Sequence, residues 1–224
     1  MTTPAPDNPL TLGFSPCPND TYIFDAWVNG RLCPSAPVVN TQLEDVETLN
    51  RWALEGRLDV TKISFHAYAY ARGRYTLLNA GGALGRGCGP LVVSKKPLTQ
   101  ADLEHASIAI PGHLTTAHLL LKLFQPKLAP ARVMTFDEIM PAIAAGVVDA
   151  GVIIHESRFT YPRYGLQLVR DLGQWWEETT GLPIPLGGIV AKTSLGPARI
   201  AAIETAIRQS LLHANAHPND PLPY

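Results

Sequence analysis

Two segments of this chain share one pattern, and that pattern constrains the fold more than any other feature. They are ALEGRLDVTKIS at residues 53–64 and AIAAGVVDAGVII at residues 142–154. Each reads as the end of a helix, a glycine, two residues, an aspartate and an apolar strand. Glycine is favoured just beyond a helix, where φ must be positive, so Gly56 and Gly146 predict helix ends. Any short helix-to-strand connection can look like this, but the flanking elements also match, and we therefore predict related elements in two lobes.

Strand-like and helix-like patterns alternate along the rest of the chain. The expected strands are residues 11–15, 38–43, 60–64, 75–79, 89–94, 107–110, 132–135, 150–154, 166–169 and 187–191. The expected helices are residues 20–29, 46–54, 67–71, 113–124, 138–145, 174–179 and 197–216. The order βαβαβ, found twice, predicts an α/β protein with mixed, mostly parallel sheets covered by helices on both faces.

This order also predicts how the chain is divided. We expect residues 1–92 and 192–224 to form the first α/β lobe and residues 93–191 the second. Two hinge strands, near residues 90–93 and 188–191, would join them beside a cleft. Ligands of open α/β sheets bind at the carboxyl ends of the strands. His66 and His155 follow two of the expected strands, so they are predicted to lie at that edge.

The composition excludes several classes of protein. The 224 residues are 46% hydrophobic, enough for a sizeable core, and the net charge of -1 without basic runs argues against nucleic acid. No apolar run approaches the roughly 20 residues of a membrane helix, and residues 1–10 do not resemble a secretory signal. Three isolated cysteines fit a reducing compartment, so we expect a cytoplasmic protein. His113 and His118 are one residue too far apart for a helical chelate, and no metal is expected.

The stretch SPCPNDTYIF, residues 15–24, predicts a stiff corner between a strand and a helix. Two prolines fix their own φ angles and restrict the residues before them. Asn19 or Asp20 is expected to cap the helix. Unpaired N–H groups at such a corner attract oxyanions, although an ordinary stop-and-start signal explains the sequence equally well. Cys17 is interpreted as a small buried filler rather than a reactive thiol, because no base is evident beside it.

A second corner, IPGHLTTAHLLL at residues 110–121, has the same character. Thr115 and Thr116 enter a strongly apolar helix, where hydroxyl and N–H groups suit a carboxylate; an ordinary helix cap is the alternative. GRGCGP at residues 85–90 is not a dinucleotide fingerprint, because no helix follows it. His155 could exchange protons at a strand end, and a histidine held only for structural reasons is the alternative.

Five segments together resemble the 1,4-dihydroxy-6-naphthoate synthase family. They are LGFSPCPNDTYIFDAW, DVTKISFHAY, IAIPGHLTTAHLLLKLF, FDEIMPAIAAGVVDAGVIIHESRFTY and GLPIPLGGIVAK. The resemblance covers nearly the whole chain, from Leu12 to about Pro221. It implies a two-lobed fold like that of type 2 periplasmic binding proteins. It also implies a carbon–carbon lyase of menaquinone biosynthesis that converts cyclic dehypoxanthinyl futalosine to 1,4-dihydroxy-6-naphthoate and dihydroxyacetone.

The resemblance also implies the site residues. The catalytic base would be His155, with no cofactor and no metal. Substrate contacts would come from Lys62, Ser64, Thr115 and Thr116, and, less directly, from the 15–21 corner and the loop at residues 183–188. In that second group we single out Ser15, Asn19, Pro185 and Leu186. Family members continue through further helical sequence beyond the residues that match HPNDPLPY, and we expect those helices to cover part of the first lobe.

Two other functions remain compatible with the same fold. One is chorismate dehydratase of the same pathway, although that enzyme lacks the SPCPNDT corner. The other is a non-catalytic binding protein for a small carboxylate, which would need a secretory signal. In each case the partner is a small-molecule carboxylate, without nucleic acid or membrane, and the protein would be a monomer or a homodimer.

Overall fold

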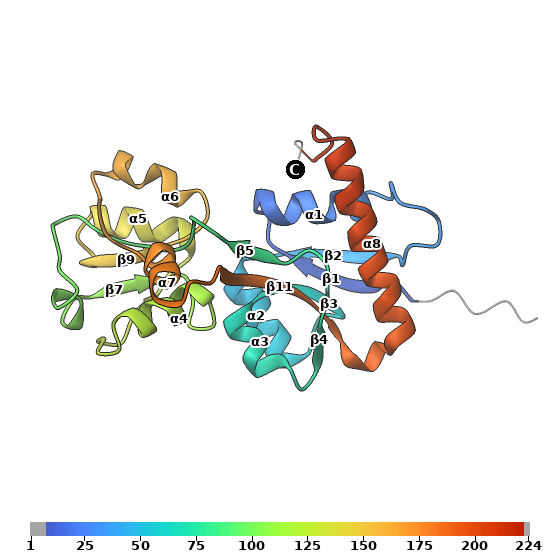
Figure 1. Cartoon of the computed structure of the whole chain (residues 1–224), viewed down its shortest axis with the longest axis horizontal. Coiled ribbons are helices and arrows are strands. Elements are labelled where there is room, and N and C mark those ends of the chain that lie inside the picture. The colour runs from blue at the N-terminus through green and yellow to red at the C-terminus, as the bar shows by residue number, and fades with distance from the viewer. Residues whose placement is uncertain (1–7, 222–224) are drawn as a thin grey trace, which may run out of the picture. The chain divides into compact units, whose positions relative to one another are not determined.

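Figure 1 shows the computed structural model, which describes residues 8–221. Contacts between Cα atoms divide the chain into two units: unit 1 is Met1–Gly82 with Gly187–Tyr224, and unit 2 is Ala83–Leu186. Both divisions fall earlier in the chain than the expected 92/93 and 191/192. The reason is strand pairing, because residues 91–94 pair within unit 2 and residues 187–192 pair within unit 1.

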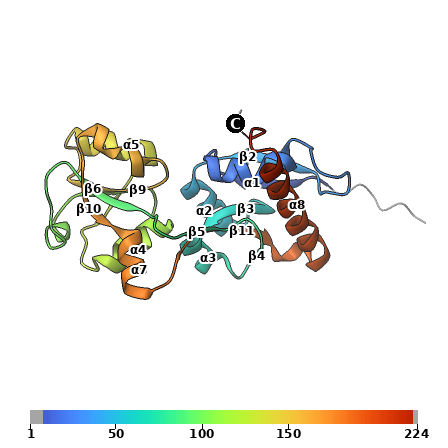
Figure 2. The same cartoon turned by 45° about the horizontal axis from the view of Figure 1, so that its top comes forward.

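Unit 1 is built on a mixed sheet. Its strands follow the order β2 (Val39–Leu43), β1 (Leu10–Phe14), β3 (Val60–Ser64), β11 (Ile184–Lys192) and β4 (Tyr75–Leu77), and β5 (Ala83–Gly85) also pairs with β11. β1 runs parallel to β2 and β3, whereas β11 runs antiparallel to β3 and β4. Figure 2 shows β3, β11 and β4 side by side. The helices of unit 1 are α1 (Pro18–Val28), α2 (Val46–Glu55), α3 (Phe65–Ala71) and α8 (Pro197–Ala216).

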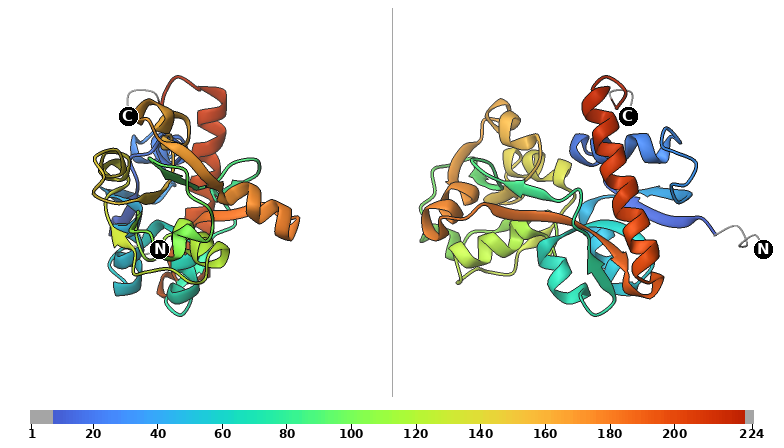
Figure 3. Two further views of the ribbon diagram at one scale, coloured as in Figure 1. Left: turned by 90° about the vertical axis from the view of Figure 1, so that its left-hand side faces the viewer. Right: turned by 45° about the vertical axis from the view of Figure 1, so that its right-hand side comes forward.

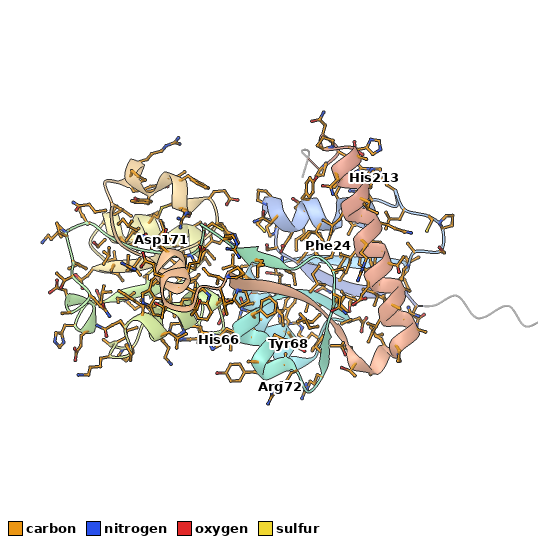
Figure 4. All side chains as sticks on the ribbon, in the orientation of Figure 1. Phe24, His66, Tyr68, Arg72, Asp171 and His213 are labelled. Atoms are coloured by element: carbon orange, nitrogen blue, oxygen red, sulfur yellow. The ribbon has the colours of Figure 1, made fainter. Side chains whose placement is uncertain are left out.

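One face of this sheet is covered by α1 and α8, which pack along each other (Figures 1 and 3). Alternate residues of the strands point to that face, as the period of a β-strand requires. Phe14 of β1 stacks on Phe24 of α1 with 4.6 Å between ring centroids, and both side chains are fully buried. Phe24 is labelled in Figure 4. The core of unit 1 therefore joins β1 and α1 to α8, which lies far along the chain.

Unit 2 is built on a second mixed sheet, in the order β10 (Gln167–Asp171), β6 (Leu91–Ser94), β9 (Ala150–Ile153), β7 (Ile108–Ile110) and β8 (Arg132–Val133). β7 runs parallel to β8 and β9, and β6 runs antiparallel to β9 and β10. The helices are α4 (Thr116–Phe124), α5 (Phe136–Ala144), α6 (Ser157–Thr160) and α7 (Leu172–Thr180). Val92 packs with α4 and α7, while Leu91 and Val93 pack with α5, so both faces of the sheet are covered.

The repeat seen in the sequence is present in both units. Gly56 and Gly146, which follow α2 and α5, have φ angles of 71° and 77°. In unit 1 the Asp59 carboxylate accepts hydrogen bonds from the backbone N–H and the hydroxyl of Thr11, at 2.9 Å each. In unit 2 the Asp149 carboxylate accepts the same pair from Ser107, at 2.8 and 2.7 Å. Each aspartate thus fastens the start of one parallel strand to the start of its neighbour.

Most of the expected elements form, with small shifts at their ends. β5 and α6 have no counterpart in the expected set. Residues 183–188, expected as a loop, are instead largely strand, because β11 begins at Ile184. In the described residues no helix is both long and apolar enough to cross a membrane. Within the same residues, no three His, Cys, Asp or Glu side chains are grouped so as to hold a metal ion.

Candidate active site

In unit 1 the candidate residues gather where β1 and β3 end. The two strands run parallel with Leu12 beside Val60, so their carboxyl ends lie at the same edge of the sheet. Ser15 follows β1 directly, and Lys62 and Ser64 belong to the last three residues of β3. All three are buried, with 8%, 7% and 4% of their surfaces exposed.

The prediction that Asn19 or Asp20 caps the first helix is wrong. Cys17 is the N-cap residue of α1, and its side chain makes no capping hydrogen bond. Asn19 lies in the first turn and is exposed. Asp20 turns inward instead, and its Oδ2 accepts hydrogen bonds from the Ser15 N–H at 3.2 Å and the Ser15 hydroxyl at 3.0 Å. A carboxylate of the chain itself therefore occupies this corner, which makes a bound anion there electrostatically unfavourable.

Lys62 is not a free positive charge. Its Nζ lies 2.5 Å from Oδ1 of Asp20, and the side chains of the two residues are 9% and 6% exposed. A buried charge needs such a partner, because removal from water otherwise costs several kcal/mol. Lys62 and Asp20 thus form a buried ion pair, joined to Ser15 through the other oxygen of the same carboxylate.

Ser64 is held from the neighbouring helix. Its backbone N–H donates to Oδ1 of Asn50 at 2.9 Å, and Asn50 Nδ2 donates to the Ser64 hydroxyl at 3.2 Å. Asn50, on α2, is fully buried. His66, labelled in Figure 4, lies two residues further on, within α3. Its ring meets the Tyr70 ring edge-on, with 5.6 Å between centroids.

Cys17 does not have the environment of an activated thiol. Burial, followed by the nearby Asp20 carboxylate, raises the pKa of Cys17 above its usual value, against the opposing effect of a hydrogen bond from Ser15. The Ser15 hydroxyl lies 2.9 Å from the sulfur. A thiol in this state stays protonated at neutral pH, so it is a poor nucleophile.

In unit 2 the second set of candidates lies at the carboxyl ends of β7 and β9. These strands are parallel, with Ala109 beside Gly151, so the residues that follow them emerge at one edge. Thr115 and Thr116 come after β7, and His155 comes two residues after β9. The structure therefore brings these three residues to the same edge of unit 2.

The two threonine hydroxyls already have partners. Thr115 is the N-cap of α4: its hydroxyl accepts from the His118 N–H at 3.2 Å and donates to the Gly112 carbonyl at 2.8 Å. The Thr116 hydroxyl donates to the Leu186 carbonyl at 2.9 Å. Because Thr115 caps the His118 N–H, the groups that α4 can offer to a ligand are the backbone N–H groups of Thr116 and Ala117. Pro185 and Leu186, both half-buried, precede the point where β11 enters unit 1.

His155 has the only positive φ of any non-glycine residue between residues 8 and 221, at 56°. This left-handed conformation is uncommon for residues with a side chain and costs about 1–3 kcal/mol. The imidazole is half-buried and meets the ring of Phe136 edge-on, with 5.4 Å between centroids. Since Phe136 begins α5 just beyond β8, the end of a third parallel strand helps to hold the histidine.

Three residues of these clusters were missed or misread from the sequence. Asp20 was taken as a helix cap, and Asn50 and Phe136 were not singled out. Asn50 is a polar residue on the apolar, buried side of the amphipathic helix α2. A polar residue at such a position indicates a buried hydrogen-bond partner, and this pattern could have identified Asn50 from the sequence. Nothing local to Asp20 indicates that its partner lies 42 residues away.

Comparison with solved structures defines the class of fold. The Candida albicans CA3427 gene product, described as having the generic periplasmic binding protein fold, aligns with a TM-score of 0.68 at 13% identity, over 96% of this chain and 74% of its own. Protein AF1704 from Archaeoglobus fulgidus aligns with a TM-score of 0.90 at 37% identity, over 97% of this chain and 81% of its own. The fold is thus that of the periplasmic binding proteins, as the sequence predicted.

Comparison of sequences then gives the family. The family model for menaquinone biosynthesis matches residues 10–224, and the chain belongs to this family. The 1,4-dihydroxy-6-naphthoate synthase of Thermus thermophilus is 58% identical over 215 residues, which are 96% of this chain and 78% of the relative.

Proposed function

We propose that this protein is a carbon–carbon lyase of menaquinone biosynthesis, which converts cyclic dehypoxanthinyl futalosine to 1,4-dihydroxy-6-naphthoate and dihydroxyacetone. The family and the Thermus relative support this activity. The observation that carries it is His155, held in a left-handed conformation just after β9. In the sheet, β9 lies next to β7, the strand that precedes α4 in the chain. Strain of this kind is retained where a side chain must be presented in one direction.

In this proposal His155 is the general base. It removes a proton from the substrate, and cleavage of the bond to the sugar-derived carbons follows. The backbone N–H groups at the start of α4, positioned by Thr115 and Thr116, receive a substrate oxyanion. Aromatisation of the ring drives the reaction, and no redox cofactor is required because carbon is eliminated and no hydride is transferred.

The remaining contacts are assigned to residues of the two sheet edges. In unit 1 these are Lys62, Ser64, Ser15 and Asn19, and in unit 2 they are Pro185 and Leu186. The substrate that they contact is a small carboxylate.

We also propose that the enzyme works in the cytoplasm. Cys17, Cys33 and Cys88 are all free thiols in the structure, as is usual for proteins of a reducing compartment.

The test is turnover of cyclic dehypoxanthinyl futalosine, with the products identified by mass. We expect His155→Asn to fold and bind substrate but to lose kcat by about 10²-fold or more. Asparagine is the suitable substitution because it tolerates the left-handed conformation, so the backbone need not change. His105→Asn, on an exposed turn of the same unit, is the matched control and should retain full activity.

Two outcomes would contradict the proposal. Turnover of chorismate in place of the futalosine substrate would identify the dehydratase. Tight binding of substrate without product from the wild type would identify a binding protein. A His155→Asn variant with nearly normal kcat would leave the activity in place but remove His155 as its base.

A further inference from the structure

The buried ion pair of unit 1 contains an acidic residue that the proposed reaction does not use. Asp20 contacts two candidate substrate-binding residues at once, Lys62 through Oδ1 and Ser15 through Oδ2. Only 4% of its surface is exposed. Its position in the first turn of α1 places one carboxylate between the ends of β1 and β3.

The Lys62 ammonium has more hydrogen-bond donors than its contact with Asp20 uses. It carries three hydrogens, and among residues 8–221 Asp20 is the one acceptor that the structure gives it. The stem of the side chain runs past Gly187, where an added Cβ would come within 3.2 Å of Lys62 Cε. The ammonium is therefore confined on one side by β11 and held on another by Asp20, with two N–H groups left for a further acceptor.

Charge decides which acceptor suits this position. Lys62 and Asp20 together carry no net charge, so the pair attracts a fully charged carboxylate less than a lone ammonium would. A neutral carbonyl oxygen can accept from one of the remaining N–H groups without loss of the Asp20 contact. If negative charge develops on that oxygen during the reaction, the same donor stabilises it more strongly.

We propose that Asp20 is a positioning residue for the lyase reaction: it holds the Lys62 ammonium so that one of its remaining N–H groups binds the carbonyl oxygen of the three-carbon fragment that leaves. This inference rests on the proposed function. The step starts after the spiro hemiacetal has opened, which frees a hydroxyl on the ring carbon, and after the hydroxyaldehyde of the fragment has isomerised to a hydroxyketone by proton transfer. The base removes the proton of that ring-carbon hydroxyl, and the electron pair of the O–H bond forms a C=O bond. The carbon–carbon bond breaks, and its electron pair leaves with the fragment as the enolate of a ketone. The proton returns to the fragment, giving dihydroxyacetone, and the ring tautomerises to the diol.

The experiment is a double-mutant cycle on the full chain. The variants are Asp20→Asn, Lys62→Met and the double variant, and kcat and KM are measured for each. Asp25→Asn is the matched control, because Asp25 lies on the same helix, is 2% exposed and is ion-paired with Arg31. Thermal unfolding is recorded for every variant. The double variant removes both charges, so it keeps the test valid if a single variant leaves an unpaired buried charge and fails to fold.

We expect Asp20→Asn to lower kcat by about 10²-fold, the usual cost of a misplaced catalytic contact, with KM changed by less than about threefold. The double variant should be no slower than Lys62→Met, because Asp20 acts through Lys62. Asp25→Asn should keep its kcat.

Three results would overturn the inference while leaving the proposed function intact. They are additive losses in the cycle, a loss confined to KM, and equal losses of kcat in Asp20→Asn and Asp25→Asn. A wild-type protein that does not turn over the futalosine substrate is a different result, which removes the proposed function and this inference with it.

Discussion

Two of the three cysteines, Cys17 and Cys33, show how strongly the pKa of a thiol depends on its surroundings. Burial raises the pKa of Cys17, whereas a hydrogen bond with Ser35 is the main cause that lowers the pKa of Cys33. Cys33 is exposed and Cys17 is partly buried. We expect iodoacetamide at about pH 7.5 to alkylate Cys33 at least about tenfold faster than Cys17, because the thiolate is the reactive form. Peptide mass spectrometry of timed samples measures both rates, with Cys33→Ser as the control. Faster labelling of Cys17 would show that the Ser15–Asp20 cluster opens readily.

At the scale of one element, α4 depends on the side chain of Thr115. Its hydroxyl caps the first turn through His118 and also ties the helix to Gly112. Thr115→Val should lower the free energy of unfolding by about 1 kcal/mol, the usual cost of a lost cap. Thr115→Ser keeps the hydroxyl and should lose much less. Urea unfolding monitored by circular dichroism compares the two. Equal stabilities would mean that the cap does not contribute.

The paired aspartates at the starts of β3 and β9 give a second prediction at this scale. The pKa of Asp59 is lowered, since hydrogen bonds from Thr11 and the contact with Lys192 outweigh burial, and hydrogen bonds from Ser107 lower the pKa of Asp149. A lowered folded-state pKa stabilises the protein above the unfolded value of about 3.9. That stabilisation is lost as the pH falls through the folded-state pKa.

We therefore expect Asp59→Ala to cost about 1–2 kcal/mol at pH 7, and Asp149→Ala to cost less because water screens its exposed carboxylate. Both differences from the wild type should be smaller at about pH 2.5 than at pH 7, because this stabilisation is lost as the pH falls through the lowered folded-state pKa values. Differential scanning calorimetry at the two pH values measures this. A penalty for Asp59→Ala that does not change with pH would assign the effect to packing.

Local patterns explain why some elements could be predicted and others could not. Gly56 with Asp59, and Gly146 with Asp149, mark helix ends and strand starts within a few residues, and the structure has both. Residues 183–188 were expected as a loop only because the family resemblance implied it, although a strand was expected from residue 187 onward. Residues 184–188 belong to β11, whose later residues pair with β3 and β4. Those partner strands lie more than 100 residues earlier in the chain, so the local sequence of residues 183–188 does not indicate the pairing. The Lys62–Asp20 pair was invisible for the same reason, because only the tertiary structure brings α1 against β3.

At the scale of the whole molecule, the chain leaves its first unit after Gly82 and returns to it at Gly187. The strand that returns, β11, does not add to an edge of the first sheet. It lies between β3 and β4 and bonds to both. The helix α8 that covers one face follows it in the chain.

This arrangement has a consequence for synthesis on the ribosome, which delivers the chain from its N-terminus. Residues 83–186 emerge as one uninterrupted stretch, so unit 2 can close its core before translation ends. The earlier residues of unit 1 must wait for β11 and α8, with the apolar faces of β1 and α1 uncovered in the meantime. A nascent-chain chaperone is therefore expected to bind residues 8–82 longer than residues 83–186.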